Sequence, residues 1–129
     1  LAVMRERPEG LIFCNLVEFD SLYGHRRDPA GYSRALQEFD ERLPELLDSL
    51  QGDDVLFLVR DHGNDPTWSG TGHTREYGML LATGPQVTAT ALGTRDSFAD
   101  LGATVAALLE IPWSGHGRSF AAALRSDIV

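Results

Sequence analysis

The apolar run at residues 55–59, which stops abruptly at a charged turn, constrains the fold of this chain most. Its five residues, Val-Leu-Phe-Leu-Val, are all β-formers, and two acidic residues precede them. This pattern predicts a short strand that is buried on both faces. Asp61 and His62 follow the strand directly, at the end where open α/β sheets place their ligands.

The loop that follows supplies a second imidazole near this strand end. Residues 63–73 contain glycines, a proline and several hydroxyl side chains, which is typical of a loop, and they end at His73. A carboxylate and two imidazoles suit a borderline divalent cation such as Zn²⁺ or Mn²⁺. An Asp-His pair before glycine also occurs in ordinary turns, so the motif alone is a weak signal.

A second strand end carries the same kind of side chain. The apolar run at residues 10–17 predicts another strand, and Asp20 and His25 follow its end. Because neighbouring parallel strands lie about 4.8 Å apart, their carboxyl ends could bring both groups into one pocket. The sequence therefore predicts a metal centre whose candidate ligands are Asp20, His25, Asp61, His62 and His73.

The segment between these strands has the pattern of an amphipathic helix. Asp28 and Pro29 are good N-cap and first-turn residues, and apolar side chains then recur at helical spacing to Leu50. We expect Pro44, inside this pattern, to kink or split the helix. Strand, helix and strand in this order predict a right-handed βαβ unit.

Further elements follow the loop. Residues 77–83 predict a third strand, residues 87–92 an edge strand, and residues 98–109 a second amphipathic helix. The predicted fold class is α/β, with a mostly parallel sheet flanked by helices. Residues 1–129 are predicted to form a single domain.

Composition limits the partners. The net charge of −8 argues against nucleic acid and anionic membranes as partners. No apolar run approaches the ~20 residues that cross a bilayer. Cys14 is the only cysteine, so it forms no internal disulfide, and we expect it to be a small core residue of a cytoplasmic protein.

Two stretches resemble one enzyme family. Residues 20–28 together with residues 61–68, then His73-Thr-Arg-Glu, are similar to phosphopentomutase, of the alkaline phosphatase superfamily of metalloenzymes. Asp-His-Gly-Asn alone is shared with cofactor-independent phosphoglycerate mutases, whereas Tyr-Gly-His-Arg-Arg-Asp and Asp-Pro-Thr-Trp point to the pentomutase branch. The resemblance covers nearly the whole chain and corresponds to the C-terminal part of a longer enzyme. It implies part of an alkaline-phosphatase-like core.

The resemblance also implies two divalent metal ions, usually Mn²⁺. Asp20, His25 and His73 would hold one ion, and Asp61 and His62 the other. In the family the second ion takes a further Asp, a threonine becomes phosphorylated, and a cap domain grips the sugar phosphate. None of these has a matching segment here, so no catalytic residue is assigned and we expect the isolated chain to be inactive.

The implied reaction is the interconversion of (deoxy)ribose 1-phosphate and (deoxy)ribose 5-phosphate. A pentose phosphate would be the substrate of the full-length enzyme, and Arg26, Arg27 and Arg75 could contact its phosphate or form ion pairs with neighbouring carboxylates. One alternative is a catalytically silent metal-binding module that forms a homo-oligomer or joins a complementing N-terminal chain. Another is a metal-dependent phosphate-ester hydrolase of the same superfamily.

Overall fold

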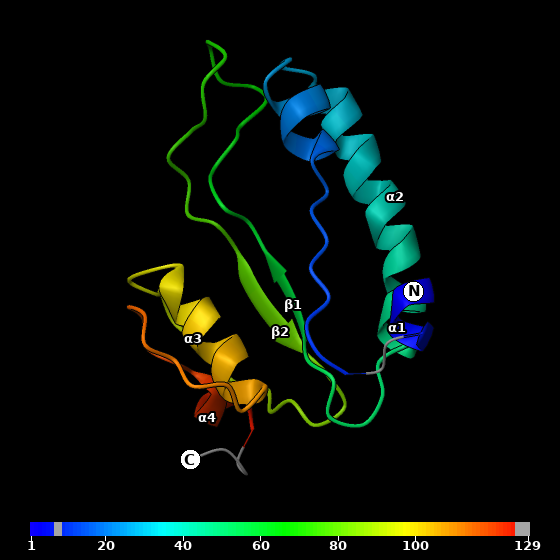
Figure 1. Ribbon diagram of the computed structural model, residues 1–129. Helices are drawn as coiled ribbons and strands as arrows, with labels where there is room; N and C mark the ends of the chain where they lie inside the picture. Colours follow the sequence, from blue (N-terminus) through cyan, green and yellow to red (C-terminus); the bar gives the residue numbers. More distant parts are fainter. Residues whose placement is uncertain (7–8, 126–129) are drawn as a thin grey trace. The chain divides into compact units, whose positions relative to one another are not determined.

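The computed structural model describes residues 1–6 and 9–125, and residues 7, 8 and 126–129 lie outside the described residues. Helices, one π-helical segment and two strands make up the described elements (Figure 1). In chain order they are α1 (Ala2–Glu6), η1 (Phe19–Gly24), α2 (Pro29–Asp48), β1 (Leu56–Val59), β2 (Leu80–Thr83), α3 (Ala99–Leu108) and α4 (Ala121–Leu124).

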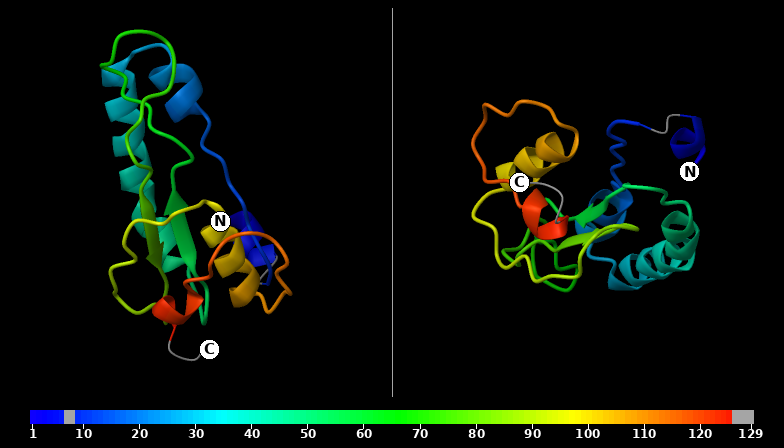
Figure 2. Two further views of the ribbon diagram at one scale, coloured as in Figure 1. Left: turned by 90° about the vertical axis from the view of Figure 1, so that its left-hand side faces the viewer. Right: turned by 90° about the horizontal axis from the view of Figure 1, so that it is seen from below.

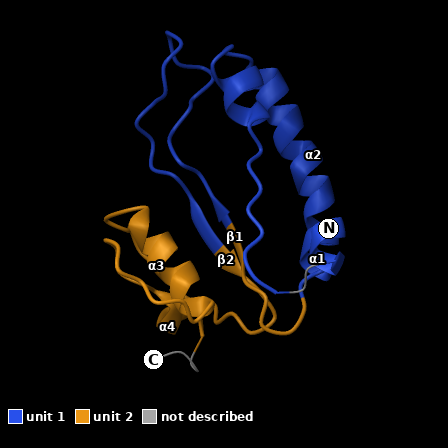
Figure 3. Ribbon diagram, in the orientation of Figure 1, with its two compact units in different colours: residues 1–50, 58–81 blue, residues 51–57, 82–129 orange. Residues whose placement is uncertain are grey.

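The chain falls into two compact units, which are coloured separately in Figure 3. Unit 1 comprises residues 1–50 and 58–81, and unit 2 comprises residues 51–57 and 82–129, so the division passes through both strands. All the candidate metal ligands belong to unit 1. That residues 1–129 form a single domain stays a prediction.

The long helix of unit 1 begins where the sequence predicts it. The carboxylate of Asp28 accepts a hydrogen bond from the backbone N–H of Gly31 at 2.8 Å, and Pro29 takes the first helical position. Pro44 lies inside α2 without dividing it, and Figure 2 shows the helix as continuous from two further sides. A proline costs about 3 kcal/mol in a helix interior, and the remaining hydrogen bonds of this 20-residue helix hold both halves together.

The sheet differs from the one predicted. β1 confirms the strand predicted over residues 55–59, and β2 confirms the last part of the strand predicted over residues 77–83. The two strands pair with each other in an antiparallel sheet, so a mostly parallel sheet is wrong for the described residues. The physical reason is local: the chain reverses between β1 and β2, and a reversal sets two strands antiparallel. β1 is only half-buried, which corrects the prediction of a strand buried on both faces.

Residues 11–17 are the second departure from the prediction. Residues 11–17 pair with neither of the two described strands, and residues 87–92 likewise form no strand. The βαβ unit is therefore absent from the part of the chain that the structure describes. Cys14 is exposed here, which corrects the expectation that it is a core residue. An apolar run becomes a strand only where a neighbouring strand satisfies its backbone hydrogen bonds.

Unit 2 has its own small core. α3 confirms the helix predicted over residues 98–109, and Leu124 of α4 is 1% exposed. The carboxylate of the buried Asp100 accepts hydrogen bonds from the backbone N–H of Arg118 at 2.8 Å and from Arg95 Nε at 3.0 Å. These bonds tie the start of α3 to the segment that leads into α4. Within the described part of the chain, no helix is both long enough and apolar enough to cross a membrane.

Candidate metal centre

Asp20 and His25 are positioned by η1, an element that the sequence patterns do not predict. Asp20 lies in its first turn, and the backbone N–H of His25 donates to the Asp20 carbonyl at 2.9 Å as the segment ends. The rings of Phe19 and Tyr32 lie 5.5 Å apart, which joins η1 to α2. A π-helical turn inserts an extra residue into each hydrogen-bonded ring and is frequent at functional sites.

His62 and His73 are brought together by the chain reversal that follows β1. The backbone N–H of Thr74 donates to the Gly63 carbonyl at 3.0 Å, which closes the reversal as an isolated antiparallel bridge. A Cβ atom at Gly63 would lie 2.5 Å from the carbonyl oxygen of Thr74, so only glycine permits this approach. As a result the two imidazole rings stack, with centroids 3.7 Å apart and an interplanar angle of 19°.

The carboxylate of Asp20 is the centre of the cluster. His25 Nε2 lies 3.2 Å from Asp20 Oδ2, and His73 Nε2 lies 3.3 Å from Asp20 Oδ1. His62 Nε2 is 4.0 Å from the same Oδ1. Ligand atoms of Asp20, His62 and His73 all lie within 4.8 Å of one another, a spacing in which a single metal ion could replace the direct contacts.

Two of the imidazoles have their other nitrogen occupied. His25 Nδ1 lies 2.5 Å from the carbonyl oxygen of Thr71, and His62 Nδ1 lies 3.2 Å from that of Gly63. A carbonyl oxygen can only accept, so each Nδ1 carries a hydrogen, and in the neutral form of either ring the lone pair would be on Nε2. Metal-ligating histidines characteristically donate in this way to a carbonyl or carboxylate. The donor set therefore fits a borderline divalent ion.

Asp61 lies at the edge of the cluster. Its side chain is 87% exposed, and its Oδ1 is 3.5 Å from His62 Nε2. The structure thus brings all five sequence-predicted residues to one place: Asp20, His25, Asp61, His62 and His73. Their division between two ions, and their roles as ligands, stay predictions.

Sequence reasoning missed the role of Asn64. This residue is 5% exposed, and its Nδ2 donates to Asp20 Oδ1 at 2.6 Å, so the amide bonds directly to the central carboxylate. The available signal was its place in the Asp-His-Gly-Asn motif, but the motif does not say which side chain the amide contacts.

The loop beside Asn64 is stiffened by hydroxyl groups. Thr74 Oγ1 accepts a hydrogen bond from the backbone N–H of Asp65 at 2.7 Å, and the Thr67 hydroxyl donates to Asp65 Oδ1 at 2.7 Å. The hydrogen bonds from Thr67 hold the pKa of Asp65 below its usual value. A hydrogen bond from Thr74 likewise lowers the pKa of Glu76. Both carboxylates are therefore ionised at neutral pH.

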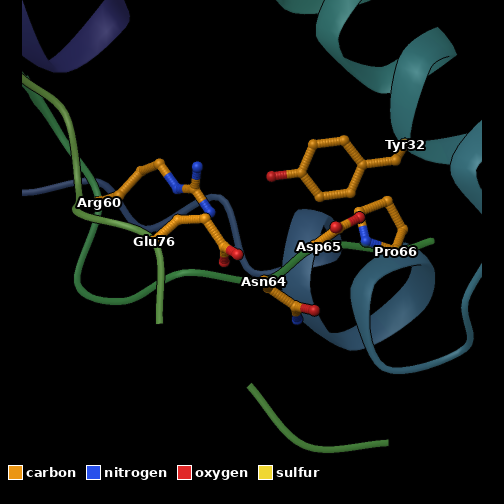
Figure 4. Close-up of a pocket in the computed structure, with 6 residues that line it drawn as sticks. All are labelled: Tyr32, Arg60, Asn64, Asp65, Pro66 and Glu76. Carbon is orange, nitrogen blue, oxygen red and sulfur yellow. The ribbon is translucent and has the colours of Figure 1, made fainter. Parts of the chain in front are cut away.

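A pocket of about 250 Å³ adjoins this loop within unit 1. Figure 4 shows Tyr32 projecting from α2 toward the side of the pocket lined by Arg60 and Glu76. Asn64, which lines the pocket, also bonds to Asp20 of the metal cluster, and the pocket is smaller than the roughly 300–1,000 Å³ of ordinary small-molecule sites. The side chains that line it are Tyr32, Arg60, Asn64, Asp65, Pro66 and Glu76.

Comparison with protein families decides the affiliation. A family model described as the metalloenzyme superfamily matches residues 1–112. The chain belongs to the metalloenzyme superfamily. This match covers all five candidate ligands, so the family and the geometry point to the same part of the chain.

Curated relatives refine this affiliation. The chain is 58% identical over 117 residues to a phosphopentomutase of Deinococcus radiodurans, covering 91% of this chain and 30% of that protein. It is 52% identical over 118 residues to a phosphopentomutase of Alkaliphilus oremlandii, covering 91% of this chain and 30% of that protein. A phosphopentomutase of Aliivibrio salmonicida is 56% identical over 119 residues, which cover 92% of this chain and 29% of that protein. The chain is thus a homologue of phosphopentomutases and spans about 30% of their length.

Proposed function

We propose that this chain forms the metal-binding part of a phosphopentomutase-type isomerase with an alkaline-phosphatase-like core. The complete enzyme interconverts (deoxy)ribose 1-phosphate and (deoxy)ribose 5-phosphate, and the chain supplies most of the ligands for two divalent ions. We assign Mn²⁺ as the ion and the cytoplasm as the compartment. A pentose phosphate is the substrate of the complete enzyme.

One observation carries the proposal: three imidazoles surround the carboxylate of Asp20 in a chain that is 58% identical to a phosphopentomutase. The histidines come from two different segments, and each presents Nε2 toward the carboxylate. The phosphate of a sugar is a multiply charged group, and its transfer needs concentrated positive charge at such a place.

In this proposal the residues of this chain hold and orient the metal ions, and they do not themselves attack the phosphate. Divalent ions, when bound, neutralise charge on the transferring phosphoryl group and activate the attacking hydroxyl. The carbonyl contacts of His25 and His62 at Nδ1 favour, in the neutral rings, the tautomer whose Nε2 is available to an ion, and Asp20 faces the same place. Asp61, as the most exposed of the set, lies on the side open to solvent.

Because the chain spans about 30% of its relatives, we assign the nucleophile and the sugar-binding cap to a complementing N-terminal chain or segment. The exposed apolar side chains of residues 11–17 support such a partner, since Phe13 is 81% and Leu11 65% exposed. In isolation the chain then binds metal, forms a homo-oligomer through the same surface, and does not turn over substrate.

A chimera tests the proposal. The matching segment of the Deinococcus radiodurans phosphopentomutase is replaced by this chain, and ribose 5-phosphate formation from ribose 1-phosphate is measured with Mn²⁺. We expect clear isomerase activity, which the Asp20→Ala chimera loses. Thermal unfolding and elemental analysis of both proteins verify that each is folded and how much Mn²⁺ it holds.

The outcomes separate the alternatives. A folded, Mn²⁺-loaded chimera that releases inorganic phosphate without forming ribose 5-phosphate supports the hydrolase instead. A folded chimera that neither isomerises nor hydrolyses supports a catalytically silent module. Ultracentrifugation of the isolated chain, alone and mixed with the N-terminal part of the relative, distinguishes a homo-oligomer from a complementing pair.

A further inference from the structure

The guanidinium of Arg27 is directed at the loop that carries the metal cluster. Nη1 donates to Asn64 Oδ1 at 2.9 Å and to the Asp65 carbonyl at 2.8 Å. Nε donates to the Gly70 carbonyl, and Nη2 donates to the Gly72 carbonyl. These acceptors span almost the whole loop between His62 and His73, so one side chain fastens both ends of it.

Asn64 continues this contact to the central carboxylate. Its Oδ1 accepts from Arg27, which leaves only the NH₂ group to face Asp20, where Nδ2 donates to Oδ1 at 2.6 Å. The amide orientation is therefore determined by the two partners together. Asn64 itself is buried, so solvent competes less for these two partly buried hydrogen bonds than it would at the surface.

The backbone around Arg27 is unusual in a way that agrees with this role. Arg27 has a φ of 54°, in the left-handed region that residues other than glycine seldom adopt. Its four side-chain hydrogen bonds are the interactions that offset this conformation. The same contacts take up donors that a phosphate would need, which argues against Arg27 as a phosphate-binding residue.

We propose that Arg27 and Asn64 are positioning residues of the metal centre, acting on the ion through Asp20 and the loop. The inference rests on the proposed function, because it takes the cluster to be a metal site. Arg27 sets the loop, Asn64 transmits that position to the Asp20 carboxylate, and neither touches the ion. Such outer partners of ligands are commonly worth about 10- to 100-fold in metal affinity.

The test measures Mn²⁺ binding to the 129-residue protein by isothermal titration calorimetry. Arg27→Lys keeps the positive charge but removes the planar guanidinium that donates from three nitrogens, and Asn64→Ala removes the side-chain amide. We expect each to weaken Mn²⁺ binding about 10- to 100-fold without lowering the number of ions bound. Arg34→Lys and Asn15→Ala, at exposed positions, are the matched controls and keep wild-type affinity.

Thermal unfolding of the metal-free variants separates positioning from general stability. Mn²⁺ affinity that falls while the metal-free melting temperature stays within a few degrees supports the proposal. Variants that bind Mn²⁺ as the wild type does, or whose affinity falls only in step with unfolding, overturn it. A wild-type chain that binds no Mn²⁺ refutes the proposed function as well, so the two failures are distinguishable.

Discussion

His25 Nε2 and His73 Nε2 lie 3.1 Å apart, although the two residues are 48 positions apart in the sequence. Both nitrogens also lie within 3.3 Å of the Asp20 carboxylate. His25 Nδ1 lies against the Thr71 carbonyl, which can only accept, so in a neutral His25 ring the lone pair would be on Nε2, facing His73. These two histidines, with Asp20, would hold a divalent ion at this place.

Removing one of these imidazoles should cost metal. We expect His73→Ala to lower the number of Mn²⁺ ions retained after dialysis by at least one, counted by elemental analysis. The matched control is His116→Ala, which removes an exposed loop imidazole of unit 2. An unchanged count in His73→Ala would take His73 out of the ligand set.

A methyl group at Gly24 should disturb the metal cluster through Asn64. A Cβ there would lie 2.7 Å from Asn64 Cγ and 3.0 Å from the Phe19 carbonyl oxygen, so the Asn64 amide has to leave the position in which it bonds to Asp20. We expect Gly24→Ala to weaken Mn²⁺ binding about 10-fold or more, measured by calorimetry. Gly72→Ala, which meets nothing within 4 Å, should bind normally. Equal affinities in the two variants would contradict this reasoning.

Asp100 should make unit 2 sensitive to acid. The backbone N–H of Arg118 donates to its carboxylate, and Arg95 pairs with it, so the pKa of Asp100 lies below its usual value of 3.8. A lowered folded-state pKa gives stability that is fully present above the unfolded-state value and is lost as the pH falls through the folded-state value.

The corresponding measurement is stability against pH for Asp100→Asn. We expect this variant to be less stable than the wild type at pH 6 and to lose less stability on acidification below about pH 3.8, where the wild type protonates. Asp96→Asn, at an exposed position of the preceding segment, serves as the control. Parallel acid-unfolding curves for the wild type and Asp100→Asn would be the opposite result.

Unit 2 should depend on Leu124 for its core. This side chain is 1% exposed, so Leu124→Ala removes buried methyl groups and leaves a cavity. We expect the free energy of unfolding to fall by about 2–5 kcal/mol, measured by urea denaturation. Leu81→Ala, at a side chain that is 55% exposed, should change it by less than about 1 kcal/mol. A loss as large in Leu81→Ala would show that burial is not the cause.

Local patterns were good predictors where the interaction itself is local. The Asp28 cap and Pro29 lie next to each other in the chain, so α2 could be placed at its first residue. β1 follows from five consecutive β-formers, and the position of Asp61 and His62 just after it follows from the order of residues.

Pairing could not be predicted in the same way. Residues 11–17 have the composition of a strand, yet β1 pairs with β2, because the hydrogen-bonding partner of a strand is chosen by what lies beside it. The contacts of Arg27 were hidden for a similar reason. Three of its acceptors are backbone carbonyls, a group that every residue has and no motif distinguishes.

By itself, the sequence determined which side chains are able to bind a metal ion, since the chemistry of an imidazole or a carboxylate belongs to the residue. It also determined that these residues follow either an apolar run or a glycine-rich loop. Only the tertiary structure decided that Asp20 is the shared partner of three histidines. The same holds for the hydrogen bonds from Asn64 to Asp20 and from Arg27 to Asn64. Distances between groups 37 to 48 residues apart depend on how the chain reverses, and the energy of that reversal is spread over many weak contacts.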